Sequence, residues 1–229
     1  MIELLSINGE TLAKSQEPNI SLAVNSEILK GNAMPKLVLG HIPVLEIASP
    51  AFLNNRLNSE IWYINNCGRV VAELNKFDFR DLICDNNAAV RDLILRDCNI
   101  DRLQITNNRC VGDIWFIRTN VQDISFGGSL LHNIAFFDSS VGGFDIIDGR
   151  ESYRQINLIG SRKDTLGIWH THHGVKFSTG CQHLISAESF RERLDCTYPP
   201  HVGSIHRVTY LAAIEMAEKI QAELIRRIG

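Results

Sequence analysis

The stretch from Val90 to Ile146 decides the fold. It reads VRDLILRDCNIDRLQI over residues 90–105 and VGDIWFIRTNVQDISFGGSLLHNIAFFDSSVGGFDI over residues 111–146. An apolar residue recurs every five positions, with one extra residue before Val111. The series is Val90, Leu95, Ile100, Ile105, Val111, Phe116, Val121, Phe126, Leu131, Phe136, Val141 and Ile146. Because Val, Leu, Ile and Phe fill about a third of an ordinary chain, an unbroken series is hard to produce by chance. It predicts a mainly β solenoid with a hydrophobic interior.

A second column, two residues before each apolar position, alternates in side-chain size. Its members are Ala88, Leu93, Cys98, Leu103, Arg109, Ile114, Thr119, Ile124, Ser129, Ile134, Ser139 and Phe144. A narrow rectangular coil requires this alternation to keep its interior volume constant. Arg109 is the exception, beside the extra residue. The same register extends back to Phe77 with Phe79 and to Leu82 with Cys84, and forward to Ile156 with Leu158.

These repeats resemble those of the pentapeptide-repeat proteins, in which a small residue, a polar residue and a central Leu or Phe recur every five positions. The resemblance implies a right-handed β-helix with about twenty residues per coil. Val90, Val111 and Leu131 would then form one stacked column, and Leu95, Phe116 and Phe136 another. The chain departs from the family pattern because the small residue appears only at every second repeat.

Short polar residues follow the central positions by two. They are Asp92, Asp97, Asn107, Asp113, Asp123, Asn133, Asp138 and Asp148. Such side chains bond neighbouring backbone and suit the corners of a coil. An acidic binding face is the alternative interpretation.

The sequence divides into three parts. Residues 1–66 are predicted to form an irregular β-rich amino-terminal cap, because short apolar runs are broken there by Gly and Pro. Residues 67–160 are predicted to form the solenoid, and proline is absent from Ala51 to Tyr198. Residues 161–229 are predicted to form a β-hairpin and a helical cap of two helices, one beginning after the N-cap Ser186 and one running from about Ile205 to Ile228.

The carboxy-terminal part carries a second resemblance. The stretch VKFSTGCQ, residues 175–182, together with Phe190 and the final helix, is similar to a segment of uncharacterised proteins from bacteria and their phages. That resemblance implies no catalytic role. Cys181 is interpreted as a packed thiol beside a turn that needs Gly180, with a nucleophile as the alternative.

The densest group of reactive side chains is WHTHHG, residues 169–174. His172 and His173 are predicted at the tip of a hairpin, and His170 and His172 would share one strand face. A metal site formed by His170, His172 and His173 is the alternative, because three imidazoles can hold zinc.

Composition excludes several classes of protein. With 45% hydrophobic and 21% charged residues and a net charge of −3, the 229-residue chain has no strong field for nucleic acid. Six cysteines without a C-x-x-C pair predict reduced thiols. The lack of a long apolar run and of a secretion signal predicts a cytoplasmic protein that does not enter a membrane. The chain contains no phosphate-binding or nucleophile-elbow motif, so no cofactor is expected.

These observations predict a non-enzymatic binding protein, of phage-related origin, that presents a rigid surface to a protein partner. Arg102, Trp115 and Arg118 are the outward residues expected to make contacts. The alternative is an enzyme or small-ligand binder at the histidine hairpin. A homo-oligomer is also expected, most simply a dimer, through a solenoid end or through apolar residues of the last helix such as Leu211 and Ile225.

Overall fold

The computed structural model describes residues 2–6, 10–32, 34, 36–40, 42–48, 57–65, 67–127, 129, 131–161, 163–180 and 182–228. The protein is mainly β, with 54% of residues in strands, and its described residues include three α-helices. It divides into two compact units, residues 1–143 and residues 144–229. No helix among the described residues is long and apolar enough to cross a membrane.

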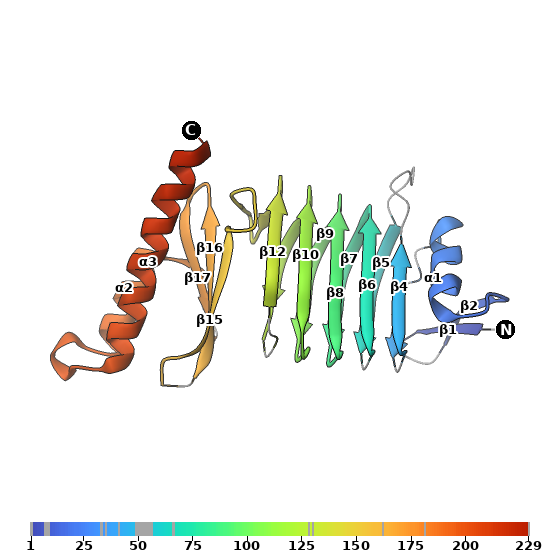
Figure 1. Ribbon diagram of the computed structural model, residues 1–229, viewed down its shortest axis with the longest axis horizontal. Coiled ribbons are helices and arrows are strands. Elements are labelled where there is room, and N and C mark those ends of the chain that lie inside the picture. The colour runs from blue at the N-terminus through green and yellow to red at the C-terminus, as the bar shows by residue number, and fades with distance from the viewer. Residues whose placement is uncertain are drawn as a thin grey trace. The chain divides into compact units, whose positions relative to one another are not determined.

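The first unit contains a β-solenoid of about four turns (Figure 1). One wall is a five-stranded parallel sheet of β4 (Val44–Ala48), β6 (Arg69–Asn75), β8 (Ala89–Arg96), β10 (Val111–Ile117) and β12 (Leu131–Phe137). The other wall, called here the long sheet, includes β3 (Leu37–Gly40), β5 (Leu57–Asn65), β7 (Phe77–Asp85), β9 (Asn99–Thr106), β11 (Asn120–Ser125) and β13 (Ser140–Val141). The chain alternates between the two walls, so strands next to each other in a sheet come from successive coils.

The two stacked columns predicted for the central residues are confirmed, whereas Ala88 of the alternating column is exposed. Val111 pairs in parallel register with Val90 and Leu131, which lie 21 and 20 residues away along the chain. Phe116 pairs in the same way with Leu95 and Phe136, and the two phenylalanine rings stack with centroids 4.6 Å apart. Eleven of the twelve central residues are buried, while Leu131 is half-buried. The five-residue period therefore identifies the interior correctly.

Two buried polar ladders mark the corners where the chain passes between the walls. One consists of Cys98, Thr119 and Ser139, the other of Asn87, Asn108 and Ser129. Five of the six side chains accept a hydrogen bond from a backbone N–H of the coil before, as Asn108 Oδ1 does from Asn87 N at 2.9 Å, whereas Cys98 Sγ donates to Leu74 O at 3.3 Å. These contacts satisfy backbone groups that the turn takes out of the sheets.

The second ladder explains why Arg109 breaks the sequence pattern. Asn108 occupies the interior position, and Arg109 is exposed. The extra residue thus follows Asn108, and it allows the polar ladder to continue while the side chain of Arg109 lies outside.

The corner prediction is right for some positions and wrong for others. Asp97, Asn107 and Asp138 have left-handed backbone, with φ of 54°, 54° and 47°, and each precedes a residue of a polar ladder. Four other residues lie inside strands instead, namely Asp92, Asp113, Asp123 and Asn133. At these four positions the strand continues, although the five-residue repeat predicts a corner there.

The amino-terminal part combines local elements with the start of the parallel stack. β1 (Ile2–Ser6) pairs antiparallel with β2 (Thr11–Ser15) and with β3. α1 (Ile20–Leu29) begins at the N-cap Asn19, whose side chain accepts from Leu22 N at 3.0 Å. β3 pairs in parallel with β5, and β4 with β6, so solenoid pairing already occurs within the stretch expected to be a cap.

The second unit is a four-stranded antiparallel sheet with two helices. After the short β14 (Phe144–Asp145), its strands are β15 (Tyr153–Ile159), β16 (Asp164–Thr171), β17 (Gly174–Thr179) and β18 (Gln182–Ser186). The predicted hairpin is β16–β17, extended by one strand on each side. Ile156 and Leu158, assigned to the solenoid register, lie in β15, whose partner β16 runs antiparallel, so that extension of the register is wrong.

The helices follow the sheet directly. α2 (Ala187–Thr197) begins at Ser186, whose side chain accepts from Ser189 N at 3.1 Å, and α3 spans Ile205–Ile228 after a short 3-10 turn at Pro200–Val202. Both helices match the prediction. Their apolar faces form a core with β16 and β17, made by Leu166, Ile168, Phe177, Phe190, Leu194, Tyr210, Ile214 and Ala217.

Candidate functional site

The three outward residues expected to make contacts lie on different faces of the solenoid. Trp115 is on β10 in the five-stranded sheet, Arg102 is on β9 in the long sheet, and Arg118 follows β10 at the corner between the walls. Trp115 and Arg118 therefore belong to the same wall and its corner, whereas Arg102 lies on the opposite wall.

On the outer face of the five-stranded sheet Trp115 has apolar neighbours, and Arg96 of β8 pairs with Ile117 at the edge of this group. Trp115 pairs with Ile94 of β8, and Ile117 pairs with Phe137 of β12. The Trp115 and Phe137 rings stack with centroids 5.7 Å apart. All four side chains are half-buried and alternate with buried residues such as Phe116, so they point outward. We call Ile94, Trp115, Ile117 and Phe137 the outer apolar patch.

Polar groups that already have partners border this patch. Arg118 makes two hydrogen bonds to Asp97 of the preceding coil, at 2.7 and 2.9 Å. These bonds lower the pKa of the Asp97 carboxyl. Asn133 Nδ2 donates to Asp113 Oδ1 at 2.7 Å. Both signs of charge are thus present, and the arginine is neutralised by its neighbour.

The long sheet presents a different surface around Arg102. Arg102 Nε lies 2.6 Å from Asp81 Oδ1, while Arg80 bridges Asp81 and Glu60 at 3.2 and 2.7 Å. Asp78, Asn99, Asn120 and Ser140 form a further hydrogen-bonded row along successive coils. This wall is covered by polar side chains that bond one another, so Arg102 acts mainly in holding adjacent coils.

The histidines of the hairpin differ in their exposure to solvent. His172 and His173 form the exposed two-residue turn between β16 and β17, whereas His170 is fully buried. Across the described parts of the chain, no group of three or more His, Cys, Asp or Glu side chains is arranged to hold a metal ion. The three imidazoles are therefore not brought together.

His170 has a defined protonation state. Gln221 Nε2 donates to Thr171 O at 2.8 Å, which leaves Gln221 Oε1 to accept from His170 Nδ1 at 3.0 Å. Nδ1 then carries the proton, and Nε2 is buried with no hydrogen-bond partner in the described structure. Burial lowers the pKa of His170, so the imidazole is neutral. The neutral His170 side chain therefore links β16 to α3 through Gln221.

The five described cysteines are free thiols, and Cys67, Cys84 and Cys98 are buried. Burial raises the pKa of Cys84 to about 12, so this thiol stays protonated and unreactive. The candidate nucleophile Cys181 lies outside the described residues.

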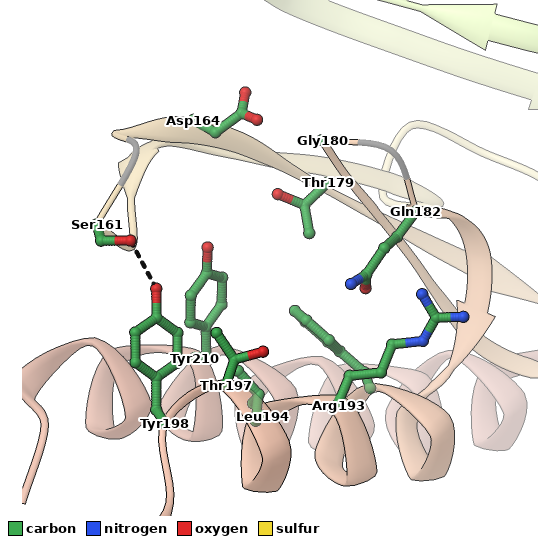
Figure 2. Close-up of a pocket in the computed structure, with 11 residues that line it drawn as sticks. Ser161, Asp164, Thr179, Gly180, Gln182, Arg193, Leu194, Thr197, Tyr198 and Tyr210 are labelled. Carbon is green, nitrogen blue, oxygen red and sulfur yellow. Dashed lines mark hydrogen bonds between the residues drawn. The ribbon is translucent and has the colours of Figure 1, made fainter. Parts of the chain in front are cut away.

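The second unit contains a cleft of about 290 Å³ that the sequence did not reveal (Figure 2). Its lining residues come from the β15–β16 turn, the β17–β18 turn, α2 and α3. They are Ser161, Asp164, Thr179, Gly180, Gln182, Phe190, Arg193, Leu194, Thr197, Tyr198 and Tyr210. No local motif joins these segments, because they meet only after the sheet has formed and the helices have packed on it.

Comparison of the chain with protein-family models, with curated proteins and with solved structures gives no match. The two family resemblances therefore rest on the sequence pattern alone, and the structure supports the coarser statement that residues 37–141 contain a β-solenoid.

Proposed function

We propose that this protein is a non-enzymatic binding protein that engages a protein partner through the outer apolar patch of its solenoid. The observation that carries the proposal is the stacked pair of Trp115 and Phe137 with Ile94 and Ile117 beside them, half-buried on the outside of a regular sheet. Outward aromatic and aliphatic side chains on adjacent strands reduce solubility unless they are covered, and such patches mark interaction surfaces.

The scaffold beneath the patch is suited to this task. Each strand of the patch is hydrogen-bonded to its neighbours in parallel register, and the buried Phe116 and Phe136 lie directly behind it. Because the side chains are held before a partner arrives, little conformational entropy is lost on binding.

The chemistry of the patch favours a protein over nucleic acid. Trp, Phe and Ile side chains are the usual anchors of protein interfaces, and paired charges such as Arg118 with Asp97 are typical of a polar rim. Phosphate backbones need free cations, whereas Arg118 is paired and Asp113 is close in sequence to Trp115.

Three finer inferences accompany the proposal. The five-residue repeat supports a right-handed β-helix of the pentapeptide-repeat type, and the resemblance of residues 175–182 supports a phage-related origin. The free thiols of the described cysteines support a cytoplasmic location. We further infer a homo-oligomer, whose test is given in the Discussion.

A photo-crosslinking amino acid placed at position 115 tests the proposal in cells of the native host. We expect it to capture a protein that the same group at position 102 does not capture. The captured protein is then purified, and its affinity for the wild-type chain and for Trp115→Ala is measured. Loss of a central aromatic anchor costs about 2 kcal/mol or more, so the variant should bind about thirtyfold more weakly or worse.

Arg102→Gln, on the other wall, is the matched control and should bind as the wild type does. Trp115→Ala removes a half-buried side chain and should cost about 1 kcal/mol, as Phe137→Ala does, which leaves the protein folded. If the purified partner binds Trp115→Ala with wild-type affinity, or if only position 102 gives crosslinks, the patch is not the interface.

A further inference from the structure

The cleft of the second unit has features of a small-ligand site, and the argument for it does not depend on the proposed function. It lies between the strand-connecting turns of the sheet and α2 (Figure 2). Its apolar floor consists of Phe190, Leu194 and Tyr210, which are 2%, 3% and 8% exposed. The Phe190 and Tyr210 rings meet edge to face at 5.4 Å. An apolar group of modest size would lie on this floor.

The floor is fixed in place by close packing. Gly160 has φ of 73°, and a Cβ on this residue would overlap the Tyr210 hydroxyl. Ser161 Oγ and Tyr198 Oη lie 2.8 Å apart and close one end of the cleft (Figure 2). Packing against Gly160 therefore holds Tyr210 in the floor, and a hydrogen bond holds one end of the cleft.

Arg193 supplies a cation that no described residue pairs with. On the same helix, Arg191 makes two hydrogen bonds to Glu218 at 2.8 and 2.6 Å, and Asp195 pairs with Arg207 at 2.5 Å. Arg193 has no ion pair or hydrogen bond with any described residue, and its guanidinium extends along the cleft wall toward Gln182 (Figure 2). A guanidinium free in a cleft is suited to bind a carboxylate by two parallel hydrogen bonds.

On the same wall, Gln182 supplies an acceptor to which no described residue donates. Gln182 begins β18, opposite Thr179 across the turn, and its Oε1 is buried with no hydrogen-bond partner in the described structure. A buried carbonyl oxygen without a donor is unfavourable, and a small rotation of the Gln182 side chain, which lines the cleft, would let a ligand donate to Oε1. The exposed Arg193 and the neighbouring Gln182 thus offer a site for an anion and a site for a donor close together.

We propose that this cleft binds a small carboxylate with an adjacent donor and an apolar side chain, that is, an apolar α-amino acid or the corresponding α-hydroxy acid. The carboxylate pairs with Arg193, the amino or hydroxyl group donates to Gln182 Oε1, and the side chain lies on Phe190, Leu194 and Tyr210. Asp164 at the rim disfavours more highly charged anions such as phosphate.

Calorimetric titration of the full chain tests the ligand chemistry. L-leucine and 2-hydroxy-4-methylpentanoate are the two positive probes, and we expect at least one to bind with a Kd of about 1 mM or tighter. Comparison of the two Kd values shows whether the cleft prefers the α-amino acid or the α-hydroxy acid. We expect 4-methylpentanoate, which lacks the donor, and isopentylamine, which lacks the carboxylate, to bind at least tenfold more weakly.

Two variants test the assigned roles. Arg193→Gln should weaken binding of the positive probe at least tenfold. Gln182→Met should remove the preference for that probe over 4-methylpentanoate, because the acceptor is gone. Glu192→Gln, next to Arg193 on α2 but outside the cleft lining, is the control and should bind as the wild type does.

The proposal is overturned if neither positive probe saturates the protein. It is also overturned if 4-methylpentanoate binds as well as the better probe, if glucose binds as tightly, or if Arg193→Gln leaves the Kd unchanged.

Discussion

Asn108 shows how one polar side chain stabilises three coils at once. Its Oδ1 accepts from Asn87 N and Asn87 Nδ2 at 2.9 and 3.0 Å, its Nδ2 donates to Cys84 O at 3.0 Å, and its backbone N–H donates to Ser129 Oγ. It is 1% exposed. Water cannot replace these contacts, so the side chain is needed where the chain turns.

Asn108→Ala should destabilise the protein by about 3 kcal/mol, because it leaves buried donors and an acceptor without partners. Asn99→Ala is the matched control, since Asn99 makes the same kind of coil-to-coil bond on the exposed surface, and we expect its cost to stay below about 1 kcal/mol. Urea denaturation measures both. Equal midpoints for the two variants would mean that the interior ladder contributes no more than the surface row.

His170 makes stability depend on pH in a specific direction. Its pKa is lowered in the folded protein, chiefly by burial, below the usual value of 6.5. The unfolded chain therefore binds more protons as the pH falls, and the stability present above about pH 6.5 declines below it, by up to about 1.4 kcal/mol per pH unit. This decline continues until the folded pKa is reached.

Replacing His170 by Asn should remove this component from the stability measured between pH 7 and pH 5. His172→Asn, at the exposed turn, should retain the wild-type dependence. Chemical denaturation at several pH values provides the measurement. A wild-type slope in His170→Asn would assign the dependence to other groups.

At the scale of elements, the phenylalanine column tests whether the two walls share one interior. Phe116→Ala or Phe136→Ala should each destabilise the protein by roughly 3–5 kcal/mol, because both rings are fully buried and stacked on each other. Phe137→Ala removes a ring from the outside of the same strand and should cost about 1 kcal/mol. Unchanged denaturation midpoints for both interior variants would contradict the assigned interior.

Close approach of neighbouring coils gives a second test at this scale. Gly112 is on β10, and a Cβ there would overlap Arg91 O of the adjacent strand. Gly112→Ala must move backbone rather than a side chain, so we expect a loss of about 2 kcal/mol in unfolding free energy. Gly127→Ala meets only contacts of 3.8 Å and longer and serves as the comparison. Identical thermal midpoints for Gly112→Ala and Gly127→Ala would show that the two strands can move apart at Gly112 without loss of unfolding free energy.

For the whole molecule, α3 bears apolar side chains on the side away from its own core. Ile205, Val208 and Met216 are 69%, 60% and 41% exposed, and their spacing places them on one face. Leu211, expected to be free for association, instead packs against the core of the second unit, whereas Ile225 is 41% exposed. An exposed stripe of this kind is best covered by a second copy.

We expect a dimer at micromolar concentration, measured by light scattering, and a monomer after the double change Val208→Glu with Met216→Glu. Leu158→Glu is the control, because Leu158 is 74% exposed on β15. Truncation before α3 is unsuitable, since Tyr210, Ile214 and Ala217 belong to the core. A mass of 25.7 kDa for the wild-type chain would refute the dimer.

The sequence by itself determined the solenoid interior, the hairpin and both carboxy-terminal helices. Each depends on side chains at a fixed short spacing, such as Phe116 with Phe136, on a local signal such as Ser186 before α2, or on the turn at His172 and His173. Tertiary structure alone decided which residues cover the corners, where Asn108 took the place that the period gave to Arg109. It also decided that Ile156 leaves the solenoid, that His170 is apart from His172, and that Arg193 meets Gln182 in one cleft. The physical reason is that a period specifies burial along one segment, whereas a pocket requires segments distant in the chain, whose meeting depends on how the sheet and helices pack.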